Sequence, residues 1–409
     1  MRQMLALFTA LAVLCISGGC NPVPKNREEA QGGKKAAEQL PAGYIRGMDL
    51  SSVVSLENSG VMFYSASGQP QDVFVTLAEA GVNYIRVRVW NNPYDIRGNG
   101  YGGGNCDVQK AAEIGRRAAQ NGMRLLVDFH YSDFWADPER QLVPKAWAAL
   151  DFEQKKAALF DYTVASLNEI WAAGADIGMV QIGNEINNGI AGESELNRVA
   201  QLLQCAASAV RKASAEKGAD VKVAVHYTDV EDYDGMMYRA ESLAAYGTDY
   251  DVFGVSYYPY WHGSLENLTK VLSDIGKKYG KSTVVLETAY PYTLADGDGF
   301  ANVVGSVETN DYPVSVQGQH DCIRDIMWAA KKGGALGVFC WESAWIPVGS
   351  DANTNRALWE ACGSGWASSF SEEYDPDNAG KYYGGCSWEN QAFFDFKGHP
   401  LDSLRVFGE

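Results

Sequence analysis

The chain has 409 residues, of which 46% are hydrophobic and 21% charged, and this composition excludes a disordered or low-complexity protein. Its 34 Lys and Arg residues against 51 Asp and Glu give a formal net charge of -17. So much negative charge repels phosphate backbones, and we therefore expect no nucleic acid among its partners. The 22 tyrosines and 11 tryptophans favour either ordinary core packing or a cleft lined with aromatic rings.

The first twenty residues have the pattern of an export signal. Arg2 precedes a short apolar run over residues 5–16, and small residues come directly before Cys20. The run is too short to span a bilayer. Small residues before a cysteine resemble a bacterial lipoprotein signal, so we expect residues 1–20 to be a signal peptide of that type, with plain secretion as the alternative. Residues 21–43, rich in Pro, Gly, Lys and Glu, indicate a flexible tether.

These segments together predict an exported protein. We expect a lipoprotein at the outer membrane or cell surface, and otherwise a periplasmic or secreted protein. Contact with the membrane would then run through a lipid on Cys20 alone.

Eight short runs rich in apolar and β-branched residues recur after the tether: residues 44–50, 82–90, 123–131, 177–185, 221–228, 252–258, 283–290 and 336–343. Five stretches between them carry apolar residues at helical spacing: 108–121, 152–173, 195–217, 265–279 and 322–332. Alternation of strand and helix predicts a parallel sheet of the α/β class. Eight repeats predict its closure into a (β/α)8 TIM barrel.

The chain from Tyr44 onwards reads as one domain, because no linker or shift in composition interrupts it. We therefore expect residues 44–409 to form a single barrel domain, and the protein to be a monomer. Residues 347–396 lack a regular pattern and would form a long loop after the eighth strand. Loops of that length are usually functional when they are ordered.

Polar side chains gather at the predicted carboxyl ends of the eight runs, where the active site of such a barrel lies. The set comprises Asp49, Arg86, Arg88, Asp128, His130, Asn184, Glu185, His226, Tyr257, Tyr258, Glu287, Trp341 and Glu342. Chance exposure of a strand end explains single members of this set. It does not explain so unusual a composition at one mouth.

Two glutamates in this set suggest acid and base chemistry. Glu185 ends the fourth run and Glu287 lies near the end of the seventh, so the two carboxyls would face each other across the barrel axis. Retaining glycosidases need two carboxyls about 5–5.5 Å apart, one as nucleophile and one as acid and base. Burial and neighbouring charge would raise the pKa of one, and Arg86 would keep the other ionised. A salt-bridge role is the alternative for either glutamate alone.

A metal-dependent hydrolase is the mechanistic rival, because such enzymes also use barrels. They need several histidine ligands, and of the five histidines only His130 and His226 fall at strand ends, without an H-x-H or H-E-x-x-H motif. The glycine-rich stretch 100–104 lacks the Lys-Ser/Thr of a phosphate-binding loop. We therefore expect no catalytic cofactor.

Six segments at these strand ends carry a family resemblance. They are R-V-R-V-W-N-N-P at 86–93, D-F-H-Y-S-D-F-W-A-D-P at 128–138, I-G-N-E at 182–185, G-V-S-Y-Y-P at 254–259, V-L-E-T at 285–288 and W-E-S-A-W at 341–345. In this order they resemble the endo-β-1,4-galactanases of glycoside hydrolase family 53. The segment at 128–138 is the most specific, whereas N-E is shared with many retaining barrel glycosidases.

The resemblance implies a role for each matching residue. Glu185 would be the acid and base and Glu287 the nucleophile, while Asn184 would bind the sugar hydroxyl next to the reacting carbon. Arg86 would hold the charge of the nucleophile. The other substrate-binding residues implied are Asp128, His130, Asp133, Trp135, Tyr258, Trp341 and Trp345.

Bacterial members of the family also bind a structural calcium ion, and the resemblance extends to those positions. They are Asp296, Asp298, Asp351, Asn353, Cys386 and Glu389. Calcium takes oxygen ligands, so Cys386 would serve only through its backbone carbonyl. Asp351 stands where a histidine is common, and a solvated acidic loop with Asx turns is the alternative.

The cysteines after the signal are Cys106, Cys205, Cys322, Cys340, Cys362 and Cys386, without a C-x-x-C pair. Cys205 and Cys340 lie in apolar runs and should be buried free thiols. Export permits disulfides, and Cys362 with Cys386 in the predicted last loop is the candidate pair.

The sequence thus predicts an exported retaining endo-β-1,4-galactanase that acts on galactan and arabinogalactan side chains of pectin. Spacing alone gives only a retaining glycosidase, and the substrate follows from the resemblance. Two alternatives stay open: a related barrel glycosidase acting on another β-1,4-glycan such as mannan or cellulose, and a non-catalytic surface glycan-binding protein.

Overall fold

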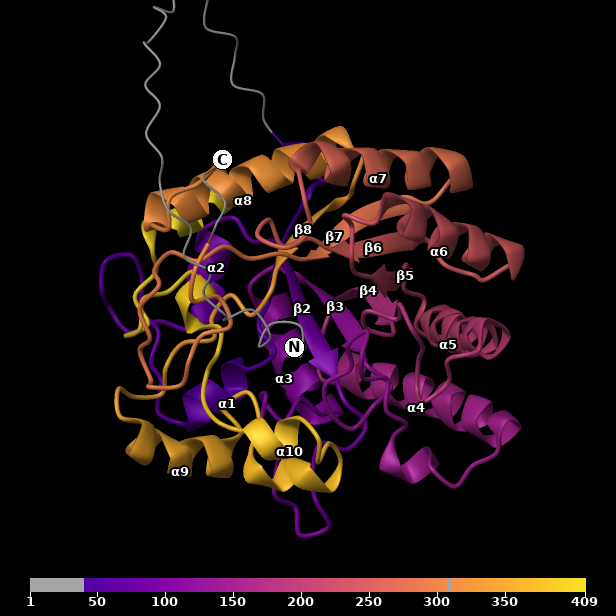
Figure 1. The fold of residues 1–409 in the computed structure, drawn as a ribbon, viewed down its shortest axis with the longest axis horizontal. Helices are drawn as coiled ribbons and strands as arrows, with labels where there is room; N and C mark the ends of the chain where they lie inside the picture. The colour runs from indigo at the N-terminus through magenta and orange to yellow at the C-terminus, as the bar shows by residue number, and fades with distance from the viewer. Residues whose placement is uncertain (1–39, 308–310) are drawn as a thin grey trace, which may run out of the picture. The chain divides into compact units, whose positions relative to one another are not determined.

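The structure, a computed structural model, describes residues 40–307 and 311–409, and its eight strands close into a barrel (Figure 1). The strands are β1 (Ile45–Asp49), β2 (Tyr84–Val89), β3 (Arg124–Phe129), β4 (Ile177–Ile182), β5 (Lys222–Tyr227), β6 (Val252–Ser256), β7 (Ser282–Glu287) and β8 (Gly337–Cys340). Neighbours pair in parallel and in chain order, and β8 pairs with β1. The predicted (β/α)8 barrel is confirmed.

The N-terminal predictions lie mostly outside the described residues. The expected signal peptide over residues 1–20, its Cys20, and residues 21–39 of the expected tether belong to that part. Leu40, which the expected boundary at Tyr44 left in the tether, is buried in the hydrophobic core at 9% exposure. Across residues 40–307 and 311–409, no helix combines the length and the apolarity needed to cross a membrane.

The helices surround the barrel (Figure 1). They are α1 (Val53–Asn58), α2 (Val73–Glu79), α3 (Val108–Gln120), α4 (Phe152–Ala172), α5 (Leu196–Lys217), α6 (Tyr233–Ala245), α7 (Leu265–Tyr279) and α8 (Val316–Lys332), with a short 3-10 helix η2 (Lys145–Trp147) before α4. Side chains and glycines mark some of their ends. Asp151 and Gln154 form a capping box at the start of α4, and Gly280 ends α7 at φ 65°, a backbone conformation that favours glycine.

Four of these helices differ from the sequence prediction: α1, α2 and α6 were not predicted, and α8 begins earlier than expected. α6 was not predicted, because it buries little more than Met236, Ala240 and Leu243 against the barrel and so lacks a clear apolar stripe. α8 begins at Val316 rather than at residue 322. The Ser315 side chain accepts the backbone N–H of Gly318 and starts the helix through a polar stretch that hides the helical period.

The segment after β8 is more regular than its sequence suggested. It contains α9 (Ala352–Cys362), η3 (Ser369–Glu373), α10 (Ala379–Tyr382) and η4 (Glu389–Gln391), and η5 (Asp402–Gly408) follows. The prediction of a wholly irregular loop over residues 347–396 was therefore wrong. Asp351 caps α9 by accepting the backbone N–H groups of Asn353 and Thr354. The backbone N–H of Gly103 bonds Gly365, which ties this segment to the loop after β2.

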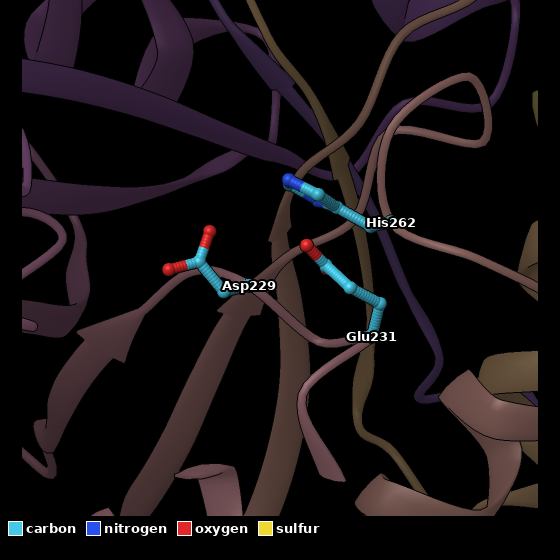
Figure 2. Close-up of side chains that lie close together, drawn as sticks. All are labelled: Asp229, Glu231 and His262. Carbon is cyan, nitrogen blue, oxygen red and sulfur yellow. The ribbon is translucent and has the colours of Figure 1, made fainter. Parts of the chain in front are cut away.

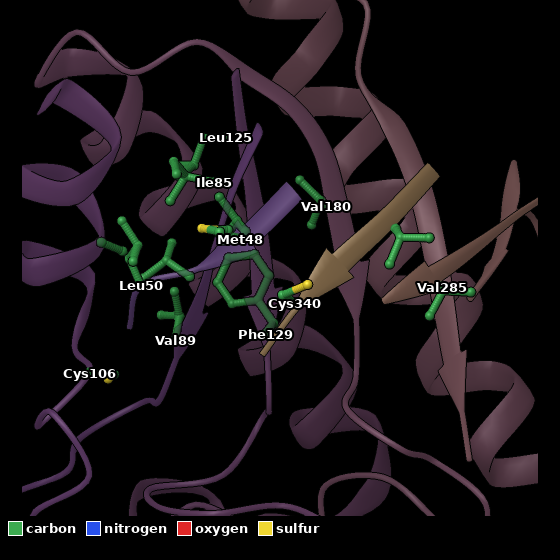
Figure 3. Packing of buried hydrophobic residues seen from close by; sticks show 14 of the residues in the cluster. Met48, Leu50, Ile85, Val89, Cys106, Leu125, Phe129, Val180, Val285 and Cys340 are labelled. Atoms are coloured by element: carbon green, nitrogen blue, oxygen red, sulfur yellow. The ribbon is translucent and has the colours of Figure 1, made fainter. Parts of the chain in front are cut away.

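Alternation along β2 decides which side chains enter the barrel. Ile85, Val87 and Val89 join the large apolar cluster between barrel and helices, part of which Figure 3 shows. Tyr84 belongs instead to a small separate cluster with Phe339 of β8. Because successive strand residues point to opposite faces, Arg86 and Arg88 lie on the side of Tyr84, inside the barrel.

The six cysteines of the described chain are free thiols. The candidate disulfide between Cys362 and Cys386 was therefore wrong. The sulfur of buried Cys386 faces the backbone oxygen of Trp345 at 3.7 Å, whereas that of Cys362 faces Asn58 at 3.6 Å, so the two thiols have different surroundings. Cys205 and Cys340 are free, as expected, although Cys205 is only half-buried.

We expect Gly47 to be required by close packing inside the barrel. A Cβ at this position would lie 2.1 Å from Cδ1 of Phe339 on the neighbouring strand. Gly47→Ala should lower the free energy of unfolding by about 1–3 kcal/mol. In a Phe339→Ala background the same change should cost clearly less, because the ring is gone. Denaturant unfolding of the four proteins measures this coupling.

Gly43→Ala is the matched control, because a Cβ at Gly43 meets no atom within 4 Å. It should change the free energy of unfolding by less than about 0.5 kcal/mol. If Gly47→Ala costs the same free energy of unfolding in both backgrounds, the contact with Phe339 is not the reason that this position requires glycine.

Candidate active site

Arg86 lies at the centre of the barrel mouth and is almost completely buried, at 1% exposure. Its Nη1 is 3.0 Å from Asp49 of β1, and its Nη2 is 2.8 Å from Asp128 of β3 and 2.9 Å from Oε1 of Glu287 at the end of β7. A buried guanidinium is stable only with such partners. The predicted pairing of Arg86 with one of the two glutamates is confirmed, and Glu287 is that glutamate.

Asn184 is held by the same guanidinium. Its Oδ1 accepts from Nη2 of Arg86 at 3.0 Å, and its Nδ2 donates to the backbone oxygen of Ala136. Gln181 of β4 donates to the same Oδ1 at 3.1 Å and accepts from Nε of Arg86 at 3.2 Å. The amide is thereby fixed in one orientation beside Glu287.

Glu287 receives a second hydrogen bond, from the hydroxyl of Tyr258 to its Oε2 at 2.9 Å. Burial raises the pKa of the Glu287 carboxyl, while Arg86 and the Tyr258 hydroxyl oppose that rise by stabilising the charged form. Both oxygens of this carboxylate are thus bonded to donors that favour ionisation.

Glu185 has different surroundings. Its Oε1 accepts from the neutral hydroxyl of Ser256 at 2.6 Å, and the Ser256 oxygen lies 2.9 Å from Nε2 of His226. Burial and the negative charge of Glu287 raise the pKa of Glu185 well above its ordinary value. The surroundings of the two glutamates therefore differ as the sequence analysis expected: Arg86 favours the ionised form of Glu287, whereas burial and the charge of Glu287 favour the protonated form of Glu185.

His130 and Asp128 support Arg86. Nδ1 of His130 accepts from the indole of Trp90 and from the backbone of Ala136, each at 3.1 Å, and its Nε2 lies 3.1 Å from Asp128. Burial raises the pKa of the Asp128 carboxyl, but Arg86 and His130 outweigh it and hold that pKa below the ordinary value. Both residues are buried, so each lies beneath the mouth rather than at its surface.

Asp133 fixes the loop after β3. Its Oδ1 accepts the backbone N–H of Asn92 at 3.0 Å and its Oδ2 that of Lys145 at 2.7 Å. The side chain is 1% exposed, and burial raises its pKa to about 6. Both oxygens are bonded to backbone donors, so the structure gives Asp133 a loop-holding role, and its substrate contact stays a prediction.

The tryptophans predicted to bind substrate form one aromatic group. The ring of Trp135 lies 6.1 Å from that of Trp341 and stacks at 6.4 Å on that of Trp345. Trp135 and Trp341 are partly exposed, whereas Trp345 is 1% exposed and donates to the backbone oxygen of Ser364. Trp345 therefore supports the ring of Trp135, and its own ring has no face exposed to solvent.

Arg88 and Glu342 form a second buried ion pair under this aromatic group. Their side chains are in direct contact, and the Arg88 guanidinium lies 4.3 Å from the centre of the Trp135 ring. Ser52 donates to the other oxygen of Glu342. Burial raises the pKa of Glu342 to about 7, against the opposing effect of Arg88.

Four non-glycine residues that follow a strand by two or three positions have left-handed backbone conformations. They are Tyr131 at φ 50°, Glu185 at φ 44°, Asp229 at φ 71° and Glu342 at φ 46°. Such conformations cost about 1–3 kcal/mol each. The surrounding packing must hold them in place.

Part of the expected calcium set comes together. Asp296 and Asp298, after β7, and Glu389 of η4 bring one carboxylate oxygen each to within 4.8 Å of the others. Asp298 and Glu389 are fully buried; burial raises their pKa values to about 6 and about 8. Oε2 of Glu389 has no hydrogen-bond partner among the described residues.

The other three expected ligands do not join this cluster. Asp351 and Asn353 are exposed, and the Asp351 carboxylate caps α9. Cys386 lies next to the cluster through its backbone N–H, which donates to Oδ2 of Asp298 at 2.8 Å. Three carboxylates with one unpartnered buried oxygen fit a hard cation such as calcium.

Sequence reasoning missed several contributors to the site. Ser256, the partner of Glu185, and Gln181, a partner of Arg86, were not singled out; alternation places Gln181 inside β4, a signal that could have found it. Trp261 was also missed, although the run Y-P-Y-W-H after β6 is rich in rings. It is 39% exposed and its ring lies 5.4 Å from that of Tyr258.

Comparison with known proteins agrees with this geometry. Residues 45–407 match glycosyl hydrolase family 53. An endo-beta-1,4-galactanase of Bacillus subtilis is 55% identical over 378 residues, which are 91% of this chain and 87% of the relative. An arabinogalactan endo-beta-1,4-galactanase of Cellvibrio japonicus is 33% identical over 85% of this chain and 86% of its own length.

A solved structure gives the same result. The family 53 catalytic domain of Ignisphaera aggregans superposes with a TM-score of 0.80 at 38% identity, covering 90% of this chain and 96% of that domain. A barrel of eight parallel strands, two unlike glutamates at its mouth and a match that spans nearly the whole described chain lead to one conclusion. The chain belongs to glycosyl hydrolase family 53.

Proposed function

We propose that this family 53 glycoside hydrolase cleaves β-1,4-galactosidic bonds within galactan and arabinogalactan side chains of pectin, with retention of configuration. The observation that carries the proposal is the contrast between the two glutamates. Glu287 is bonded to Arg86 at 2.9 Å, whereas Glu185 is bonded to a neutral serine. The substrate follows from the relatives, since the one from Bacillus subtilis is named an endo-beta-1,4-galactanase.

In the first step Glu287 acts as the nucleophile. One of its oxygens attacks the anomeric carbon, and the bond from that carbon to the leaving sugar oxygen breaks. Glu185 gives its proton to that oxygen, so the leaving sugar departs as a neutral alcohol. Arg86 and Tyr258 keep Glu287 ionised and aligned before the attack.

In the second step a water molecule replaces the leaving sugar. Glu185, now ionised, takes a proton from the water, whose oxygen attacks the anomeric carbon and releases Glu287. Two inversions at the same carbon retain its configuration. Asn184, fixed by Arg86 and Gln181, is placed to bind the hydroxyl of the neighbouring carbon.

The partly exposed rings supply the sugar-binding surface. Trp135 and Trp341 present apolar faces on one side of the mouth, and Trp261 presents a third near Tyr258. The ring of Trp388 lies 4.6 Å from that of Trp341 and 5.6 Å from that of Tyr258, so the rings form one continuous group that suits an extended substrate, as an endo-acting enzyme requires. Trp345 stabilises this surface through Trp135.

Two other functions would share parts of this site. A glycan-binding protein could use the rings, but it would not need the ion pair between Arg86 and Glu287. A related glycosidase acting on mannan or cellulose would share the glutamates. A reducing-sugar assay on purified galactan, with mannan and cellulose as parallel substrates, distinguishes all three. Release of sugar from galactan alone is the expected result.

We also propose that Asp296, Asp298 and Glu389 hold a structural calcium ion. The unpartnered buried oxygen of Glu389 and the raised pKa values of two of the carboxyls support this site. A bound cation would compensate three carboxylates that otherwise repel one another. It would join the loop after β7 to η4 and would take no part in the chemistry.

Export and anchoring are proposals from the sequence. Cys20 would be the lipid-bearing first residue of a monomeric outer-membrane or cell-surface lipoprotein. Cys20→Ser should then abolish labelling by radioactive palmitate and release the protein from the membrane fraction. Unchanged fractionation would support the alternative, a periplasmic or secreted protein. Size-exclusion chromatography with light scattering tests the expected monomer.

We expect the two glutamates to respond differently to removal. Glu287→Ala should abolish turnover of galactan, and azide should not restore products of retained configuration. Glu185→Ala should lose about 10²–10⁴-fold on galactan but keep slow activity on galactosides with good leaving groups, which need no protonation. Product configuration is read by NMR, and inverted product from the unmodified enzyme would contradict the retaining mechanism.

Tyr258→Phe should shift the acidic limb of the pH profile of kcat/KM to higher pH. The hydroxyl favours the ionised form of Glu287, so its loss raises the pKa of Glu287 and delays ionisation as the pH increases. Loss of a hydrogen bond to a charged group corresponds to about one pH unit.

Tyr257→Phe is the matched control for this shift. Its hydroxyl donates to the backbone oxygen of Gly263 at 2.8 Å, away from Glu287. The acidic limb of this variant should stay where it is in the unmodified enzyme. An unshifted limb in Tyr258→Phe would show that the hydroxyl does not set the ionisation of the nucleophile.

Removal of calcium should lower the melting temperature and leave initial rates at moderate temperature nearly unchanged, because the ion stabilises only the folded state. Asp296→Asn should remove this calcium dependence, whereas Asn in place of Asp377, an exposed residue of the segment after β8, should preserve it. The dependence should fade at low pH, since calcium binds ionised carboxylates. A melting curve unaffected by chelator would refute the site.

A further inference from the structure

Two buried polar side chains on neighbouring strands connect to Glu185. The hydroxyl of Ser256, in β6, donates to Oε1 of Glu185 at 2.6 Å, and its oxygen lies 2.9 Å from Nε2 of His226, in β5. Both side chains are completely buried, at 0% exposure. The reaction steps described above assign no role to either of them.

The neighbours of His226 decide which of its ring nitrogens carries a hydrogen. The backbone N–H of Glu185 points at Nδ1 from 3.4 Å, and the side-chain nitrogen of Gln181 lies 3.1 Å from the same atom. Oδ1 of Asn184 is 2.9 Å away, but it already accepts from Arg86 and Gln181. The amide nitrogen of Gln181 carries two hydrogens, one for Oδ1 and one for Nδ1. Nδ1 is therefore an acceptor.

The charge state of the ring leaves one arrangement of its hydrogen. Burial and the positive charge of Arg86 hold the pKa of His226 well below its ordinary value. His130 acts in the same direction, and the opposing effect of Asp128 is smaller than that of burial. The ring is therefore neutral at neutral pH. A neutral imidazole carries one hydrogen, and since Nδ1 is an acceptor, that hydrogen is on Nε2.

The direction of each hydrogen bond follows from this tautomer. The Nε2–H of His226 donates to the Ser256 oxygen, so the single hydrogen of the hydroxyl is directed at Oε1 of Glu185. In a protonated carboxyl the carbonyl oxygen is the better acceptor. Because Oε1 is the oxygen that accepts, the acid form of Glu185 carries its proton on Oε2.

We propose that His226 and Ser256 are positioning residues that fix the acid proton of Glu185 on Oε2 and so leave that oxygen to meet the glycosidic bond. The proposal rests on the function proposed above, in which Glu185 protonates the leaving sugar. A carboxyl that could rotate freely would present its proton in only part of its orientations. With Oε1 bonded to Ser256, the carboxyl is held in the orientation that the first step needs.

Other charges also act on Glu185 and bear on any test by pH. Burial is the largest cause that raises its pKa, and three carboxyls on other elements add to it: Glu287 of β7, Asp137 after β3 and Asp229 after β5. Figure 2 shows Asp229 beside Glu231 and His262. The hydroxyl of Ser256 opposes these effects, because it favours the charged form. Removing the hydroxyl and keeping the carboxyls isolates its contribution.

The tautomer of His226 is measured on the unmodified protein without substrate, so this result does not depend on the proposed activity. Nitrogen NMR of protein labelled at histidine distinguishes protonated from unprotonated ring nitrogens. The signals of His226 are identified by their absence from His226→Gln. We expect a protonated Nε2 and an unprotonated Nδ1. A proton on Nδ1 overturns the proposal.

Ser256→Ala should move the basic limb of the pH profile of kcat/KM to higher pH. Activity falls as Glu185 loses its proton, and without the hydroxyl its pKa is higher, so the fall comes about one pH unit later. At neutral pH kcat/KM for galactan should decrease at least about tenfold. For galactosides with good leaving groups, which need no protonation, kcat/KM should change little.

Ser371→Ala is the matched control, because Ser371 is also buried and its hydroxyl donates to the backbone oxygen of Ser368 at 2.7 Å, within η3. Its basic limb should stay in place, and Ser256→Thr, which keeps a hydroxyl, should restore the limb.

The proposal is overturned if Ser256→Ala leaves the limb unshifted, or if it lowers kcat/KM equally for galactan and for activated galactosides. Failure of the unmodified enzyme to cleave galactan would instead refute the proposed function, and the tautomer of His226 would still be decided by NMR.

Discussion

The guanidinium of Arg86 is the charge around which the mouth of this barrel is arranged. An ion buried so deeply costs several kcal/mol unless other charges compensate it. Here the compensation comes from Asp49, Asp128 and Glu287, which lie on three different strands. Arg86 favours the charged forms of Asp128 and Glu287. The charge of Glu287, the proposed nucleophile, therefore depends on this cluster.

That cluster also explains how two chemically identical side chains acquire opposite roles. Burial raises the pKa of Glu287, but Arg86 lies 2.9 Å from it and stabilises its charged form. Glu185 is bonded to Ser256, and burial together with the negative charge of Glu287 raises its pKa well above the ordinary value. The difference follows from which strand each residue ends. Neither glutamate would have its role if the other were missing.

Much of this arrangement could be predicted from the sequence. The periodicity of the strand and helix patterns predicted the barrel. The residues at the predicted strand ends, which were expected at its mouth, included Arg86, Asn184, Glu185 and Glu287. These predictions held because a parallel barrel brings the carboxyl ends of all its strands to one face. Family likeness added the substrate, which spacing alone did not determine.

Other features depended on contacts that a linear pattern does not contain. Ser256 of β6 reaches Glu185 past β5, which lies between β4 and β6, and the ring of buried Trp345 stacks on that of Trp135. Asp133 has a side chain suited to binding a sugar, but both of its carboxylate oxygens accept hydrogen bonds from backbone N–H groups. The expected disulfide failed because export permits such a bond without bringing the two thiols together.

The left-handed backbone at Tyr131, Glu185, Asp229 and Glu342 has an evolutionary consequence. Strain at four positions of one pole is comparable with the stability of about 5–15 kcal/mol that a domain usually retains. The stability that offsets this strain must come from the opposite pole, where the strands begin. Residues there pack tightly, as Gly47 does against Phe339. Substitutions there can accumulate stability without touching the reaction. In a barrel divided in this way, substitutions at the active-site end can change the substrate that is bound. The folding stability that they cost is offset by packing at the other end.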